Sequence, residues 1–117
     1  MTEQQFDGLL LEAIDKALSS LGNSIMHTIY FHLEKSFFIK RDEIPYRLGA
    51  FTQAIENIFG VGADVLEILI ANKLYEEIGE VFDRNESGRF SFMECATAAK
   101  NCFQQKNRIT TIEELAE

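Results

Sequence analysis

The stretch Glu43–Ile78, EIPYRLGAFTQAIENIFGVGADVLEILIANKLYEEI, holds two runs of regularly spaced apolar residues on either side of the turn Gly60-Val61-Gly62. In each run these residues recur every three or four positions, which places them on one face of a helix. Proline suits a first helical turn, so Ile44-Pro45 marks the start of the first helix. The sequence therefore predicts two amphipathic helices that form an antiparallel hairpin. Their apolar faces consist of Leu48, Phe51, Ile55, Ile58 and Phe59 before the turn, and Leu66, Leu69, Ile70, Leu74 and Ile78 after it.

Two more helices are predicted before this hairpin. Thr2 to Leu21 shows one broad apolar face, and Gly22 stops the helix. Ser24 to about Phe37 forms the second helix, with apolar residues four positions apart. Residues 38–43 are then expected to form a connector that leads into the hairpin.

The sequence after the hairpin is also helical in pattern. The second helix of the hairpin is expected to continue through Gly79 to Phe82, and a fifth helix to cover about Ser91 to Gln104. A capping-box pattern at Thr111 and Glu114 predicts a short sixth helix. The predicted fold is a single all-α domain over residues 1–117, with five to six helices in an orthogonal or bundle-like arrangement.

The charge and the aromatic content narrow the class of partner. The 11 basic and 19 acidic side chains give a formal net charge of -8, which repels phosphate backbones and anionic membrane surfaces. Nucleic acid and membranes are therefore not expected as partners. Ten phenylalanines are many for this length, so some are expected on a face that a monomer leaves open. This predicts a homodimer or a protein partner, with the contact at Phe37, Phe38, Ile39 and Tyr46 around the connector.

The cysteines and the hydropathy pattern indicate a reducing compartment. Cys95 and Cys102 are seven positions apart on a predicted helix, about 10 Å from each other, which is too far for a disulfide. No apolar run reaches membrane-spanning length, and the acidic, amphipathic N-terminus is unlike a signal peptide. A cytoplasmic protein is expected.

Residues 83–94, DRNESGRFSFME, match the pattern of a twelve-residue calcium loop. A hard cation needs several oxygen ligands, and Gly88 would allow the sharp bend at the sixth position. The same letters are also explained by a turn that leads into a capping box at Ser91 and Glu94. The loop has few charges and no second loop to pair with, so any calcium affinity is expected to be weak. The candidate metal ligands are Asp83, Asn85, Ser87, Arg89 through its carbonyl, Ser91 and Glu94.

Catalytic motifs are not visible in the sequence. His27 and His32 are five positions apart, which places them on different faces of one helix and not together as metal ligands. No nucleophile elbow or His-Glu-x-x-His zinc helix is present. The chain is therefore expected not to be an enzyme and to have no catalytic residues, with calcium as the one candidate cofactor.

Several segments together resemble an archaeal family of helical domains, the Nitrosopumilus output domain. They are HLEK at 32–35, EIP at 43–45, IFG at 58–60 followed by Gly62-Ala63, and Leu74-Tyr75. The resemblance covers about residues 9–79 and implies an all-helical module in signalling, with no established enzymatic activity. The expected function is thus a non-enzymatic regulatory or protein-interaction module for signal output. The alternative is a calcium sensor that uses the loop at 83–94.

Overall fold

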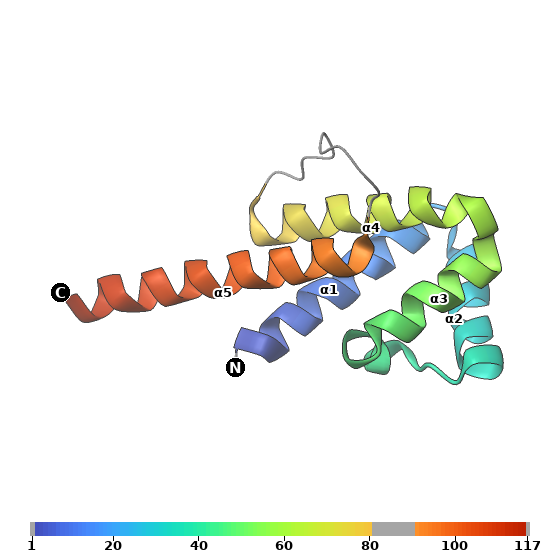
Figure 1. Cartoon of the computed structure of the whole chain (residues 1–117), viewed down its shortest axis with the longest axis horizontal. Coiled ribbons are helices and arrows are strands. Elements are labelled where there is room, and N and C mark those ends of the chain that lie inside the picture. Colours follow the sequence, from blue (N-terminus) through green and yellow to red (C-terminus); the bar gives the residue numbers. More distant parts are fainter. Residues whose placement is uncertain (1, 81–90, 117) are drawn as a thin grey trace.

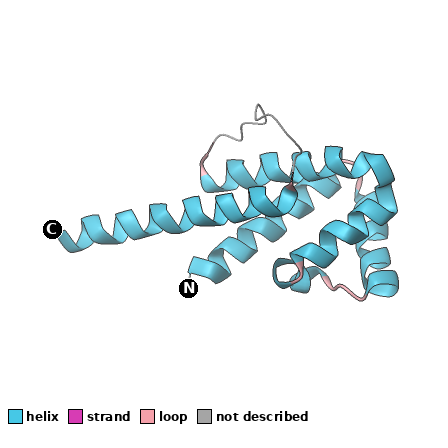
Figure 2. Ribbon diagram, in the orientation of Figure 1, coloured by secondary structure: helices cyan, strands magenta, loops and turns pink. Residues whose placement is uncertain are grey.

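The computed structural model describes residues 2–80 and 91–116, and the side chains of 5–80 and 91–105. Within these residues the chain forms five α-helices and two short 3-10 helices and contains no strand, which confirms the all-α fold class (Figures 1 and 2). The α-helices are α1 (Thr2–Ser19), α2 (Asn23–Phe37), α3 (Leu48–Phe59), α4 (Ala63–Ile78) and α5 (Phe92–Ala116). The 3-10 helices are η1 (Arg41–Tyr46) and η2 (Gly60–Gly62).

The helix pair α1 and α4 forms the centre of the molecule. Its contact is the most extensive between any two elements, and α5 lies against both helices (Figure 1). Ala13 and Ala17 of α1 are fully buried, and their small side chains let neighbouring helices approach closely. The helices α2 and α3 lie at the end of the molecule away from the C-terminus (Figure 1).

The predicted apolar faces form one hydrophobic core. Phe51 and Ile55 of α3 are fully buried, and so are Ile70 and Leu74 of α4. Leu48, Ile58, Phe59 and Leu69 are partly buried against them. The core also takes Phe6, Leu10, Ile14 and Leu18 from α1, Ile29 and Leu33 from α2, and Phe92, Ala96 and Ala99 from α5.

The two helices of the predicted hairpin differ from their predicted bounds at one end each. Pro45 lies in η1, and α3 begins only at Leu48, because Arg47 adopts a φ of -131° that interrupts the helical turn between them. The helix α4 stops at Ile78 and does not run on to Phe82, since Gly79 takes the left-handed conformation that caps a helix (φ 76°).

The predicted sixth helix is wrong as a separate element. Thr111 and Glu114 lie inside α5, which is continuous from Phe92 to Ala116. No glycine or proline separates Gln104 from Thr111, so nothing in the sequence stops the helix there. No helix of the described part of the chain is long and apolar enough to cross a membrane.

Candidate interaction surface

The connector between α2 and α3 begins with an unusual residue. Phe38 has a left-handed backbone (φ 58°, ψ 38°), and it is the only non-glycine residue with a positive φ among the described residues. This conformation crowds the Cβ atom, so the C-terminal cap of a helix is usually glycine. The side chain of Phe38 is also 77% exposed, so it gains little from burial.

The residues on either side of Phe38 explain why the backbone is held there. The N–H groups of Phe38 and Ile39 both donate to the Leu33 carbonyl, the latter at 2.9 Å, so this carbonyl at the end of α2 is satisfied by the turn. The Ile39 side chain lies in the core with 2% exposure. Ile39 was predicted as a partner contact, but burial removes it from the surface. Phe37 is partly buried against the core.

The far end of the connector is tied back to its beginning. An Arg47 guanidinium N–H donates to the Phe38 carbonyl at 2.5 Å. Tyr46, next to Arg47, is 74% exposed. Two of the four predicted contact residues, Phe38 and Tyr46, therefore display large aromatic rings at the two ends of a closed connector. We call these two residues with Arg47 the connector surface.

A cluster of polar side chains fixes the connector to the helices behind it. Arg41 of η1 donates to both carboxylate oxygens of Asp15 on α1, at 3.0 and 2.5 Å, and the Tyr30 hydroxyl of α2 donates to the same carboxylate at 2.5 Å. Partial burial alone would raise the pKa of Asp15, but the hydrogen bonds from Arg41 and Tyr30 outweigh it and the pKa is lowered. Burial raises the pKa of Tyr30, and the hydrogen bond to the Asp15 carboxylate raises it further.

This cluster holds elements together and is not poised for proton transfer. A general acid or base works best when its pKa lies near the working pH, whereas the pKa values of Asp15 and Tyr30 are shifted away from neutrality in opposite directions. A shallow cavity of about 490 Å³ adjoins the cluster and is also lined by His27. His27 and His32 are both exposed.

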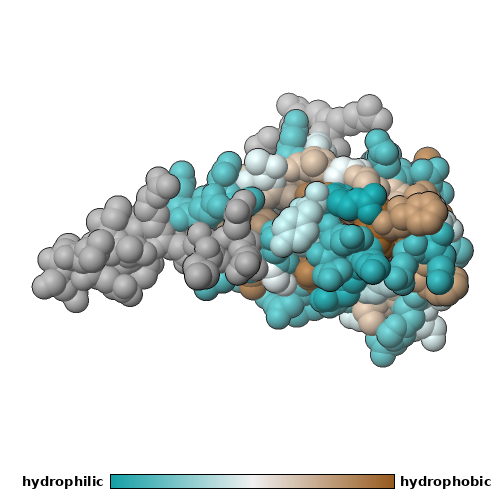
Figure 3. All heavy atoms as spheres, turned by 90° about the horizontal axis from the view of Figure 1, so that it is seen from below, coloured by the Kyte–Doolittle hydropathy of each residue, from teal (hydrophilic) through white to brown (hydrophobic). Residues whose placement is uncertain are grey.

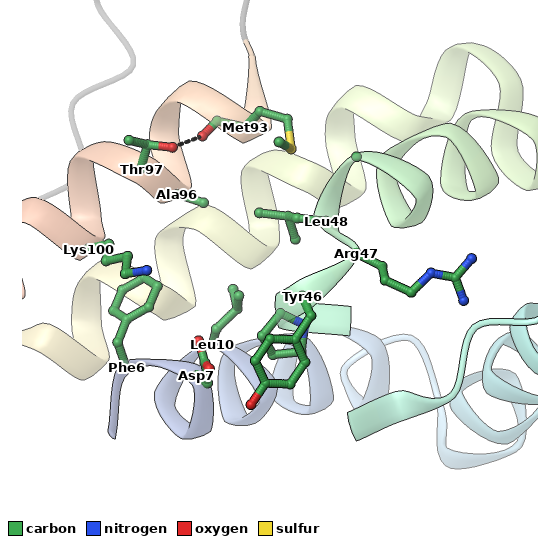
Figure 4. Close-up of a pocket in the computed structure, with 12 residues that line it drawn as sticks. Phe6, Asp7, Leu10, Tyr46, Arg47, Leu48, Met93, Ala96, Thr97 and Lys100 are labelled. Carbon is green, nitrogen blue, oxygen red and sulfur yellow. Dashed lines mark hydrogen bonds between the residues drawn. The ribbon is translucent and has the colours of Figure 1, made fainter. Parts of the chain in front are cut away.

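A second cavity, of about 330 Å³, lies beside Tyr46. Its walls come from α1, η1, α3 and α5, and Figure 4 shows the labelled side chains arranged around it. Tyr46 and Arg47 both line part of this cavity, but their side chains point in different directions (Figure 4). The Arg47 guanidinium reaches away to the Phe38 carbonyl. The lining is mainly apolar, with Phe6, Leu10, Leu48, Met93 and Ala96, and includes Asp7, Thr97 and Lys100.

The predicted calcium ligands lie mostly outside the described residues. Four of them lie between residues 80 and 91, outside the described ranges: Asp83, Asn85, Ser87 and Arg89. At Ser91 and Glu94 the structure shows the capping interaction, because the Ser91 hydroxyl oxygen accepts from the Glu94 N–H at 3.3 Å. Within the described residues, no group of three or more His, Cys, Asp or Glu side chains is arranged to hold a metal ion.

One unusual residue was missed by the sequence reasoning. Glu67 of α4 is only 4% exposed, and its Oε2 atom has no hydrogen-bond partner among the described residues. Burial, together with the charges of Glu56 and Asp64, raises the pKa of Glu67 to about 7. The signal was present, because Glu67 interrupts the apolar run from Val65 to Ala71 on the face that enters the core.

No protein-family model, no curated protein and no solved structure matches this sequence.

Proposed function

We propose that this chain is a non-enzymatic regulatory or protein-interaction module that binds a protein through the connector surface. The observation that carries the proposal is Phe38. Its backbone conformation costs about 1–2 kcal/mol for a residue with a Cβ, and its exposed ring returns little of this by burial. A residue that is unfavourable for folding and still presents an aromatic ring to solvent is explained by a contact outside the chain.

The surroundings of Phe38 support a protein partner. Aromatic rings and arginines are the residues most often found at the centres of protein interfaces, and the connector surface has Phe38, Tyr46 and Arg47. The hydrogen bonds of Arg47 and Arg41 fix the connector before binding, which lowers the entropic cost of association. The cavity beside Tyr46 is a second, largely apolar place for a partner's side chain.

The signalling role rests on the family resemblance. We propose that the module belongs with the archaeal output domains and acts in the cytoplasm, downstream of or beside a signal receptor. The absence of a helix that could cross a membrane among the described residues is compatible with this location.

The test compares binding by the wild-type chain with binding by Phe38→Gly. Glycine adopts the left-handed cap without strain, so this variant is expected to keep its stability or to gain up to about 1 kcal/mol. Proteins captured by the wild-type chain from extracts of its own cells would be identified, purified and titrated by calorimetry. We expect Phe38→Gly to bind about tenfold more weakly or worse, as for an aromatic interface anchor.

Ile25→Ala is the matched control, because Ile25 is also an exposed apolar residue but lies near the start of α2, whereas Phe38 caps the end of that helix. It is expected to bind like the wild-type chain. Equal binding by Phe38→Gly and wild type would refute the proposal. A large loss of stability in Phe38→Gly would show that the ring has a structural role instead.

A calcium sensor is the alternative function, and the relative direction of α4 and α5 weighs against it. In a calcium loop the first and twelfth residues bind the same ion, so the preceding helix ends close to where the next begins. Here α4 and α5 run in the same direction, and the end of α4 and the start of α5 lie at opposite ends of their contact (Figure 1). Calcium titration by calorimetry, with Glu94→Gln as control, tests this function; saturable binding that the variant loses would support it.

A further inference from the structure

A second exposed apolar patch lies at the turn between α3 and α4. Val61 is 100% exposed and Val65 is 71% exposed. Two exposed carboxylates, Glu56 at the end of α3 and Asp64 at the start of α4, accompany these valines. Both carboxylates act on the pKa of the buried Glu67, so negative charge is concentrated at this turn. We call Glu56, Val61, Asp64 and Val65 the valine–acid patch.

The surface of α2 next to the connector surface has a patch whose charge is opposite to that of the valine–acid patch. Phe31 lies one helical turn before Lys35 on α2 and is 58% exposed. The Lys35 ammonium lies 5.9 Å from the centre of the Phe31 ring. Phe38 follows three residues later. Among the described residues, no carboxylate forms an ion pair with Lys35. We call Phe31, Lys35 and Phe38 the aromatic–basic patch.

The two patches are on the same end of the molecule. The helix α2 and the turn between α3 and α4 both lie at the end away from the C-terminus (Figure 1), and apolar side chains are exposed at this end (Figure 3). Each patch has an apolar centre, and the charges beside these centres are opposite. An interface between two such patches would bury the apolar residues and neutralise Lys35 with a carboxylate.

We propose that the partner of this surface is a second copy of the chain, related by a two-fold axis, with the aromatic–basic patch of each copy against the valine–acid patch of the other. The proposal rests on the proposed function, because it names the protein that Phe38 contacts. A two-fold axis forms the same contact twice, so both patches of both copies are covered.

The net charge of the chain favours this particular pairing. Two molecules of charge -8 repel each other unless the surfaces that meet are complementary. Pairing two valine–acid patches would bring carboxylates together, and pairing two aromatic–basic patches would bring lysines together. The crossed pairing places Lys35 against Glu56 or Asp64 and avoids both repulsions.

Charge reversal tests the crossed pairing. Sedimentation or light scattering is expected to show that the wild-type chain reaches twice its 13.3 kDa mass as its concentration rises. Lys35→Glu and Glu56→Lys are each expected to remain monomeric, because each places like charges at both contacts of the dimer. An equimolar mixture of the two variants is expected to dimerise, with one original contact and one reversed contact. The double variant is expected to dimerise alone.

Glu12→Lys is the control for a charge change elsewhere, since Glu12 is exposed on α1 and belongs to neither patch. It is expected to dimerise like the wild type, and circular dichroism would confirm that all variants are folded. A wild-type chain that stays monomeric, single variants that still dimerise, or a mixture that does not would each overturn the proposal. A monomeric wild type that still loses another partner in Phe38→Gly would leave the proposed function standing.

Discussion

Glu67 places a carboxyl group among the apolar side chains of α4, and its ionisation is coupled to folding. Its pKa is raised from 4.5 to about 7, so between these two values the folded chain holds a proton that the unfolded chain has lost. The free energy of unfolding therefore falls as the pH rises from about 4.5 to about 7, and above that range the loss caused by the buried Glu67 carboxylate is complete and no longer changes with pH. A shift of this size corresponds to at most about 3 kcal/mol.

Glu67→Gln removes this dependence and keeps nearly the same volume. We expect the variant to be more stable than the wild type by about 1–3 kcal/mol at pH 8 and close to it at pH 4.5. Urea unfolding at both pH values measures the difference. Glu56→Gln is the control, because it removes a neighbouring negative charge but leaves Glu67 in place, and it should give a smaller gain. A variant that is less stable than wild type at pH 8 would show that the Glu67 carboxylate is satisfied in the fold.

Individual residues also show which helix ends can be predicted from the sequence. The ends of α1 before Gly22 and of α3 before Gly60 are predictable, because glycine tolerates the positive φ that both residues adopt. The stop at Phe38 is not visible, because phenylalanine does not favour that backbone. The cap forms there because Ile39 enters the core, and burial in the tertiary structure outweighs the local preference.

At the scale of elements, one carboxylate joins three of them. Asp15 of α1 accepts from Tyr30 of α2 and from Arg41 of η1. These residues are 15 and 26 positions from Asp15, and no periodicity or motif connects them, so the contact could not be predicted from the sequence. It decides how the connector sits on the helices behind it, and thereby where Phe38 and Tyr46 are displayed.

Asp15→Asn is expected to weaken this junction. The pair with Arg41 is bidentate but partly exposed, so we expect a loss of about 1 kcal/mol at pH 7. Because the folded pKa of Asp15 is lowered from 3.8, its contribution is present above that value and disappears as the pH falls through the folded pKa. Urea unfolding of wild type and variant at pH 7 and at about pH 3 measures this.

Arg41→Lys is the matched variant for this junction. Lysine keeps the positive charge but cannot donate two parallel hydrogen bonds to one carboxylate. If the geometry of the pair is important, Arg41→Lys should lose a large part of what Asp15→Asn loses. Wild-type stability in both variants would refute a structural role for the cluster.

At the scale of the whole molecule, the amphipathic periodicity was sufficient for the fold class and for most of the core. Phe51, Ile55, Ile70 and Leu74 are buried as their spacing predicts. Which helices pack against each other could not be predicted from the sequence, because many arrangements bury the same apolar faces. The exposed surface could be predicted only in part. The excess of phenylalanine predicted an exposed aromatic face, but the apolar pattern around the connector did not separate exposed Phe38 from buried Ile39.

The helix α5 has two parts with different relations to the rest of the chain. Its first part is held in the core by Phe92, Ala96 and Ala99, and Phe103 contacts Phe6 with 6.0 Å between the ring centres. Its last part continues beyond the other helices (Figure 1). Most of the stability of a helix in a protein comes from tertiary packing, so a helical segment that continues beyond the other helices is expected to add little, whereas removing a buried phenylalanine ring costs about 3–5 kcal/mol.

We therefore expect a chain that ends at Gln105 to unfold within about 2 °C of the full chain's midpoint, because a loss of well under 1 kcal/mol shifts the midpoint only slightly. Phe92→Ala in the full chain is expected to lower the midpoint by about 10 °C or more. Calorimetry on both variants, at a concentration where the wild type is monomeric, measures the two effects separately from self-association. A large drop on truncation after Gln105 would show that the last part of α5 packs on the domain or on a second copy, and repeating the scan over a range of concentrations would tell these two cases apart, because only a contact between copies makes the midpoint depend on concentration.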